Sequence, residues 1–172
     1  MNKFNLTPRV QKIINLSRET SLNLNSTNIC LNHLLHSILD TDQSTILNFF
    51  QDLNIPLEDF KIFVYNEIDN DFEDTAAADK KPSVFCSDFK EVFTSAKDFS
   101  EELDHNYIGV EHLFYVLLTF DASPLPGFLK TFDVDLKKAI KKLRNFFSTG
   151  EWKKNRIPKN FESTPQTKDP SS

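Results

Sequence analysis

Histidines and one cysteine are the side chains whose spacing could do chemistry in this chain. His33 and His36 lie three positions apart, which puts both on one face of a helix, as two metal ligands would be. Cys30 precedes His33 by three positions, so a thiol and an imidazole could act as nucleophile and base. Only two other side chains that could bind a metal lie at ligand spacing from a histidine: Cys30 near His33, and Glu111 next to His112. The full set of histidines is His33, His36, His105 and His112.

These patterns lack the groups that would complete a catalytic or metal site. A thiol and an imidazole on one short helix supply neither an oxyanion hole nor a third residue to orient the base. The carboxylates of Asp98, Glu101 and Glu102 fit a solvated helix face, with no apolar enclosure to raise a pKa for acid–base work. We therefore expect no catalytic residue, no metal and no cofactor. Cys30 is expected to be a small buried thiol.

Composition narrows the classes of function. The net charge of −5 argues against nucleic acid as the main partner, because phosphate neutralisation needs a basic surface. The 3 glycines cannot build a phosphate-binding loop, so we expect no nucleotide hydrolysis. The 2 cysteines are too few and too far apart to suggest a disulfide framework or a zinc site, which favours a reducing compartment. Without a long apolar run or leader, the sequence predicts a soluble, cytoplasmic protein and no membrane partner.

The chain contains an internal repeat, which organises all of these residues. The offset that takes His33 to His112 also aligns their surroundings without a gap, and large apolar positions fall on apolar ones. Residues 28–35 fall on residues 107–114, and residues 53–57 fall on residues 132–136.

Apolar spacing and start signals predict four helices in each copy. Thr7 and Pro8 form a start signal, a hydroxyl N-cap followed by proline at the first helical position. Helical periodicity then predicts the remaining elements. The predicted helices cover about residues 8–24, 32–39, 44–50 and 56–64 in the first copy and 87–103, 110–120, 123–132 and 133–147 in the second.

Changes in composition predict the domain boundaries. The first repeat occupies residues 1–68, an acidic linker residues 69–84 and the second repeat residues 85–147. Residues 148–172 lose apolar periodicity and are predicted to form an extended C-terminal arm. Its large apolar side chains would dock on a partner or on the domain itself; these are Trp152, Ile157 and Phe161.

Two segments resemble a known family. Leu6-Thr7-Pro8-Arg9-Val10-Gln11-Lys12 and His105-Asn106-Tyr107-Ile108-Gly109-Val110-Glu111-His112-Leu113 are similar to the motifs of the Clp N-terminal double-repeat domain, found at the N-terminus of Clp-type AAA+ unfoldases. The resemblance implies an all-α fold, in which two four-helix repeats form a pseudo-twofold eight-helix bundle. It also implies a docking domain for adaptors and substrates, here standing alone without ATPase modules, as in accessory subunits of the Clp proteolytic core.

One branch of the family reads phosphorylated arginine, and there a glutamate in each repeat contacts the guanidinium group. Here the second repeat keeps Glu111, whereas the first has Asn32, which cannot offer a charge-assisted hydrogen bond. Thr7 opens the first repeat, but Cys86 takes the equivalent position in the second. The resemblance thus leaves at most one ligand site, around Glu111 with Phe85 and Cys86. We expect no phosphoarginine binding.

Two functional hypotheses follow. The leading one is a non-catalytic protein-interaction module that binds Clp ATPase or peptidase subunits, adaptors or client proteins. Its binding surface would be the groove between the repeats, with exposed apolar anchors and charges on the rim. The alternative is a structural subunit of a larger assembly, a viral particle or a protease complex, whose C-terminal arm contacts neighbouring subunits.

Overall fold

The computed structural model describes residues 3–41, 43–70 and 84–148 of the chain, and most of these residues lie in helices. The predicted all-α fold is confirmed. Most of the predicted acidic linker, and the arm after Ser148 with Trp152, Ile157 and Phe161, lie outside the described residues. The elements are α1 (Pro8–Asn23), β1 (Asn28–Ile29), α2 (Leu31–Leu39), α3 (Ser44–Asp52), α4 (Leu57–Asn70), β2 (Val84–Phe85), α5 (Ser87–Glu102), α6 (Val110–Thr119), α7 (Leu125–Thr131) and α8 (Leu136–Ser148).

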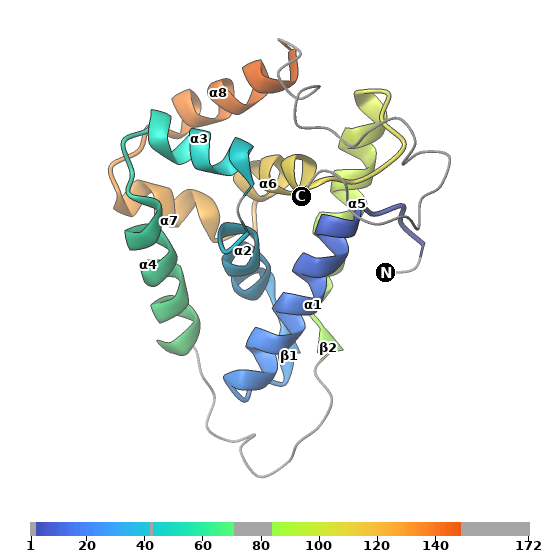
Figure 1. The fold of residues 1–172 in the computed structure, drawn as a ribbon, viewed down its shortest axis with the longest axis vertical. Coiled ribbons are helices and arrows are strands. Elements are labelled where there is room, and N and C mark those ends of the chain that lie inside the picture. The colour runs from blue at the N-terminus through green and yellow to red at the C-terminus, as the bar shows by residue number, and fades with distance from the viewer. Residues whose placement is uncertain (1–2, 42, 71–83, 149–172) are drawn as a thin grey trace.

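The internal repeat of the sequence is also a repeat of the structure. Helices α1, α2 and α4 begin at the residues whose partners at the repeat offset begin α5, α6 and α8. The packing repeats as well, since α1 contacts α2 as α5 contacts α6, and α2 contacts α4 as α6 contacts α8. Figure 1 shows α2 and α6 in the middle of the molecule, with the other helices around them. Two copies of one four-helix unit therefore form the bundle.

Helix ends show the repeat at single-residue precision. Among the described residues, four other than glycine have a positive φ, and each comes shortly after a helix. Asparagine and aspartate tolerate this left-handed conformation better than most residues, because their short polar side chains bond locally. The four are Asn25 and its repeat partner Asp104, and Asn54 and its repeat partner Asp133.

The start of α1 follows the sequence signal. The Thr7 hydroxyl accepts a hydrogen bond from the backbone amide of Val10 at 3.1 Å, and Pro8 opens the helix. Helix α5 begins after Cys86, whose side chain makes no capping hydrogen bond. The two equivalent helix starts are therefore capped differently.

A shared hydrophobic core joins the two repeats. Helices α2 and α6 are buried along almost their whole length, and α2 contacts α6 directly. Phe114 of α6 packs edge-on against Phe49 of α3, with ring centroids 5.0 Å apart, and Phe50 packs on Phe60 at 4.9 Å. Pure hydrophobes such as phenylalanine need no polar partner in such a core.

Two short parallel backbone contacts also tie one repeat to the other. Ile29 of β1 pairs with Phe85 of β2, and Leu6 pairs with Ile108 in an isolated bridge. These two contacts, here called the Ile29–Phe85 junction and the Leu6–Ile108 junction, are related by the repeat offset. Each junction lies at the start of two helices, so it sets the positions of the N-cap residues there.

Candidate functional site

Glu111, in the first turn of α6, is held by side chains of the first repeat. The Gln43 side-chain amide donates a hydrogen bond to Glu111 Oε2 at 2.6 Å. Gln43 is the buried N-cap residue of α3, and the buried Thr45 hydroxyl also hydrogen-bonds the carboxylate. The positive charge of Arg9 lies close enough to act on it. The carboxylate thus links α6 to the start of α3, across the boundary between the repeats.

Burial raises the pKa of Glu111 above its usual value, because the ionised form loses hydration. Its own backbone amide, Arg9, Gln43 and Thr45 act in the opposite direction by favouring the ionised form. Gly109 leaves room for the Glu111 carboxylate, since a Cβ at residue 109 would lie 3.1 Å from Glu111 Oε1. The carboxylate is therefore already supplied with donors from the protein itself.

The structure places the predicted site residues at two different junctions. Thr7 lies at the Leu6–Ile108 junction, where its amide donates to the Ile108 carbonyl at 3.2 Å. Cys86 lies at the Ile29–Phe85 junction, where its amide donates to the Ile29 carbonyl at 3.0 Å. Asn32 follows Cys30 at the start of α2, beside this second junction.

Phe85 and Cys86 accordingly make their contacts apart from Glu111. The Phe85 ring packs on Phe89 at 4.7 Å between centroids, and the Arg18 guanidinium lies 5.2 Å from the Phe85 centroid. The contacts described for Glu111 instead come from Gln43, Thr45 and Arg9. Gln43 and Thr45 were not identified from the sequence, because their repeat partners are Ala122 and Pro124, which share no polar pattern with them.

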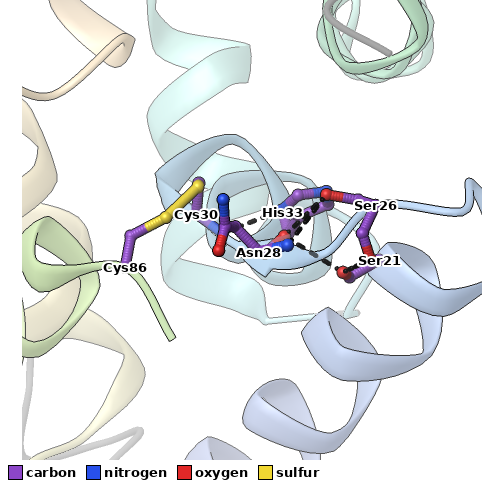
Figure 2. Close-up of a disulfide and its surroundings, with 6 residues drawn as sticks. All are labelled: Ser21, Ser26, Asn28, Cys30, His33 and Cys86. Carbon is purple, nitrogen blue, oxygen red and sulfur yellow. Dashed lines mark hydrogen bonds between the residues drawn. A yellow bond between two sulfur atoms is a disulfide. The ribbon is translucent and has the colours of Figure 1, made fainter. Parts of the chain in front are cut away.

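The expectation that Cys30 is a free buried thiol is wrong. Cys30 forms a disulfide with Cys86, and neither cysteine is fully buried. Figure 2 shows the bond reaching from the start of α2 to the start of α5. The pair escaped the sequence argument because the two residues are 56 positions apart and meet only in the fold.

His33 and His112 close the first turns of α2 and α6. His33 Nδ1 accepts a hydrogen bond from the Cys30 amide at 2.9 Å, and His112 Nδ1 accepts one from the Gly109 amide at 2.8 Å. An accepting Nδ1 carries no proton, so each neutral ring carries its proton on Nε2. For His112, that proton points to His105 Nδ1, 2.8 Å away.

Burial lowers the pKa of both capping histidines. The pKa of His112 falls to about 3, through desolvation first and the nearby His105 second. Desolvation lowers the pKa of His33 to about 4, although its hydrogen bond with Cys30 acts in the opposite direction. Both rings are therefore neutral at pH 7 and serve as helix caps. In the described part of the chain, no three His, Cys, Asp or Glu side chains gather as a metal site would require.

We expect Glu111→Ala and Gln43→Ala each to lower the free energy of unfolding by about 1 to 3 kcal/mol, since each leaves a buried polar partner unsatisfied. The double variant should lose less than the sum of the two, because both single changes break the same hydrogen bond. Urea unfolding of the four proteins measures this coupling. Additive losses would contradict the role assigned to the Gln43–Glu111 contact.

The same contact bears on ligand binding. Gln43 already occupies one carboxylate oxygen at 2.6 Å, and the first repeat offers neutral Asn32 at the equivalent position. Titration calorimetry with phosphoarginine is therefore expected to show no binding at millimolar concentration. Glu111→Ala and Asn32→Ala would then leave the titration unchanged, whereas micromolar binding lost only in Glu111→Ala would show a working site.

No helix that the structure describes is long and apolar enough to cross a membrane.

Comparisons with known proteins agree on one family. The model of the Clp repeat (R) N-terminal domain matches the chain twice, over residues 5–83 and 84–169. The chain is 23% identical over 128 residues to the chaperone protein ClpB of Clostridium perfringens, which covers 74% of this chain and 15% of that protein. The chain thus spans a small part of this relative's length.

Solved structures share the fold. The Hsp104 N-terminal domain from Candida albicans superposes with a TM-score of 0.66 at 14% identity, over 80% of this chain and 88% of that one. The N-terminal domain of the caseinolytic protease associated chaperone ClpD from Arabidopsis thaliana gives a TM-score of 0.59 at 22% identity, over 82% and 96%.

Proposed function

Since the chain belongs to the Clp repeat (R) N-terminal domain family, we propose that it is a non-catalytic module that binds other proteins. The observation that carries this proposal is the double match, in which both repeats of the chain fit one interaction domain. The partners that this function implies are Clp ATPase or peptidase subunits, adaptors or client proteins. Neither nucleic acid nor a membrane is part of the proposal.

The site around Glu111 supports a non-catalytic function. Its carboxylate accepts hydrogen bonds from Gln43 and Thr45, so it is held in place by the fold. The capping histidines are neutral and bonded to backbone amides. Acid–base catalysis needs a group that can exchange protons with a substrate, and the lone pairs of the His33 and His112 rings already accept hydrogen bonds from backbone amides.

Exposed apolar side chains suggest where a protein partner would bind. Ile62 and Tyr65 lie three positions apart on α4 and are 58% and 38% exposed. Tyr65 also packs against His36 of α2, with centroids 5.2 Å apart. Beside them, Lys61 forms ion pairs with Asp40 and Glu58, which gives this surface a charged rim. An apolar centre with a charged rim is typical of protein-binding surfaces.

The proposed surface differs from the groove between the repeats that the sequence suggested. Ile62 and Tyr65 both belong to the first repeat. The other large apolar side chains that are exposed in the described residues are Leu22 and Leu47, also of the first repeat, and Val84. We therefore place the anchoring contacts on α4.

Affinity capture with the full chain, using an extract of its native source, tests this function. We expect Clp ATPase or peptidase subunits, adaptors or clients to be retained. Ile62→Asp should reduce retention about tenfold or more, because it removes an apolar anchor that the partner would bury. Leu47→Asp is the matched control, since Leu47 is 40% exposed on α3 and outside the proposed surface. Equal retention by both variants would contradict the assignment to α4.

The same experiment addresses the alternative function. Retention of particle or assembly proteins in place of Clp components would favour a structural subunit of a larger assembly. In that case, removal of residues 149–172 should abolish retention, because the alternative gives the arm the contacts with neighbours. Retention that is independent of the arm favours the interaction module.

A further inference from the structure

Both cysteines of the chain meet at the Ile29–Phe85 junction. Cys30 is the N-cap residue of α2 and Cys86 is the N-cap residue of α5, so the bond joins the starts of two helices from different repeats. Figure 2 shows Cys30 directly beside His33 and the chain segment at Asn28. In the described residues, this disulfide links the two repeats covalently, in addition to the polypeptide backbone.

The backbone brings the two cysteines together. The amide of Val84 donates to the Thr27 carbonyl at 3.1 Å, and the amide of Cys86 donates to the Ile29 carbonyl at 3.0 Å. These bonds hold the two Cα atoms 5.3 Å apart, which is within the range that a disulfide spans. Both residues are half-buried, so neither cysteine is enclosed in the core.

The equivalent junction shows what the cysteines replace. At the Leu6–Ile108 junction, the positions of Cys86 and Cys30 are taken by Thr7 and Gly109. There Thr7 caps its helix through its hydroxyl, while Cys86 gives α5 no such hydrogen bond. A threonine would cap the helix better, since N-cap hydroxyls stabilise helices. Local helix stability therefore does not account for the sulfur at this position.

We propose that Cys30 and Cys86 form a thiol–disulfide exchange site that switches the Ile29–Phe85 junction between a covalent and a non-covalent state. The oxidant is a small disulfide such as oxidised glutathione, and the reductant is a thiol. One cysteine thiolate attacks the small disulfide and releases a thiolate, which leaves a mixed disulfide on the protein. The second cysteine thiolate then attacks the mixed disulfide and displaces the remaining small thiolate, so two electrons pass from the protein to the oxidant and the two cysteine protons end on the two small thiols.

The two states differ in what holds the repeats together at this junction. In the oxidised state, the bond ties the start of α5 to the start of α2 and closes the chain from Cys30 to Cys86, a separation of 56 residues. In the reduced state, the junction depends on backbone hydrogen bonds such as that from Cys86 to Ile29. Cross-links that close long loops stabilise mainly by restricting the unfolded chain. The exchange should therefore change both local opening and overall stability.

Redox titration of the full chain tests the switch. The protein is equilibrated with mixtures of reduced and oxidised glutathione and then alkylated with iodoacetamide. Its mass, determined by mass spectrometry, gives the number of alkylated cysteines. We expect both cysteines to be alkylated in excess reduced glutathione and neither in excess oxidised glutathione. Reduction should also lower the melting temperature by about 5 to 15 °C, as expected for the loss of a long-range disulfide.

Matched variants come from the chain's own second junction. Cys86→Thr and Cys30→Gly introduce the residues found at the equivalent positions, and their melting temperatures should not respond to dithiothreitol. Hydrogen exchange at residues 27–30 and 84–86 should be faster in the reduced wild type than in the oxidised one. Unlike melting, this measurement does not depend on whether a variant folds.

Three results would overturn the proposal. The first is alkylation of both cysteines in the native chain at excess oxidised glutathione. The second is a mixed disulfide with glutathione that persists on either cysteine. The third is an internal disulfide whose reduction changes neither the melting temperature nor hydrogen exchange at the junction. All three are independent of whether the chain binds Clp components, so they test this site apart from the proposed function.

Discussion

Lowering the pH from 7 to 5 is expected to reduce the free energy of unfolding by about 4 kcal/mol, through His33 and His112 together. In the folded chain their pKa values are about 4 and about 3, whereas the ordinary value is 6.5. The unfolded chain therefore binds more protons than the folded chain between pH 6.5 and these lower values. The contribution of these two histidines to the free energy of unfolding is fully present above pH 6.5 and is lost as the pH falls through this window.

The hydrogen bonds explain why these rings resist protonation. Protonation of His112 at Nδ1 would remove the acceptor of the Gly109 amide and place a charge beside His105 and the Phe147 ring. Protonation of His33 would do the same to the Cys30 amide, and its buried Nε2 has no hydrogen-bond partner in the described residues. For both rings, burial and a neighbouring histidine, His36 beside His33 and His105 beside His112, disfavour the charged form and lower the pKa.

Urea unfolding at pH 7, 6 and 5 measures this effect. His112→Asn is the informative variant, since an amide oxygen can accept the Gly109 hydrogen bond and does not titrate. It should remove about half of the pH dependence. Glu111 acts in the opposite direction, because its raised pKa makes the folded chain bind more protons as the pH falls, so Glu111→Gln should steepen the acid loss. A stability that is constant or increases towards pH 5 in the wild type would contradict the assignment.

The repeat explains why so much of the fold follows from sequence. One offset aligns His33 with His112, and it also aligns the left-handed residues Asn25 and Asn54 with Asp104 and Asp133. Each of these residues has a local cause: a cap acceptor in the first turn, or a short polar side chain after the last turn. Helix starts and ends that depend on residues close together in the chain can therefore be predicted from sequence.

The site was harder to predict because its contacts are tertiary. Gln43 reaches Glu111 across 68 positions, and nothing in the residues around Gln43 signals an acceptor. The cysteines posed the same difficulty, although the repeat held one usable signal. Cys30 and Cys86 align with Gly109 and Thr7, and the contact of those two segments at one junction implies contact of the cysteines at the other. That inference needs the pairing of the segments, which only the fold supplies.

Phe114→Ala is expected to lower the free energy of unfolding by about 3 to 5 kcal/mol, the usual cost of removing a buried aromatic ring. Phe114 is fully buried on α6, and its ring lies 5.0 Å from Phe49 and 6.2 Å from Phe50 between centroids. Both partners belong to α3 of the first repeat. The change therefore leaves a cavity between the two repeats as well as removing apolar area, and the surrounding helices can only partly close it.

Phe128→Ala is the matched control for this loss. Phe128 is the repeat partner of Phe49, but it is only partly buried and packs against Phe63 at 5.2 Å. Its removal opens a site that water can enter, so we expect a loss of about 1 to 2 kcal/mol, less than for full burial. Denaturant unfolding of both variants compares the two. Equal losses would mean that the contact of α6 with α3 contributes no more than a surface aromatic pair, and the two repeats would then have to be held together mainly at their junctions.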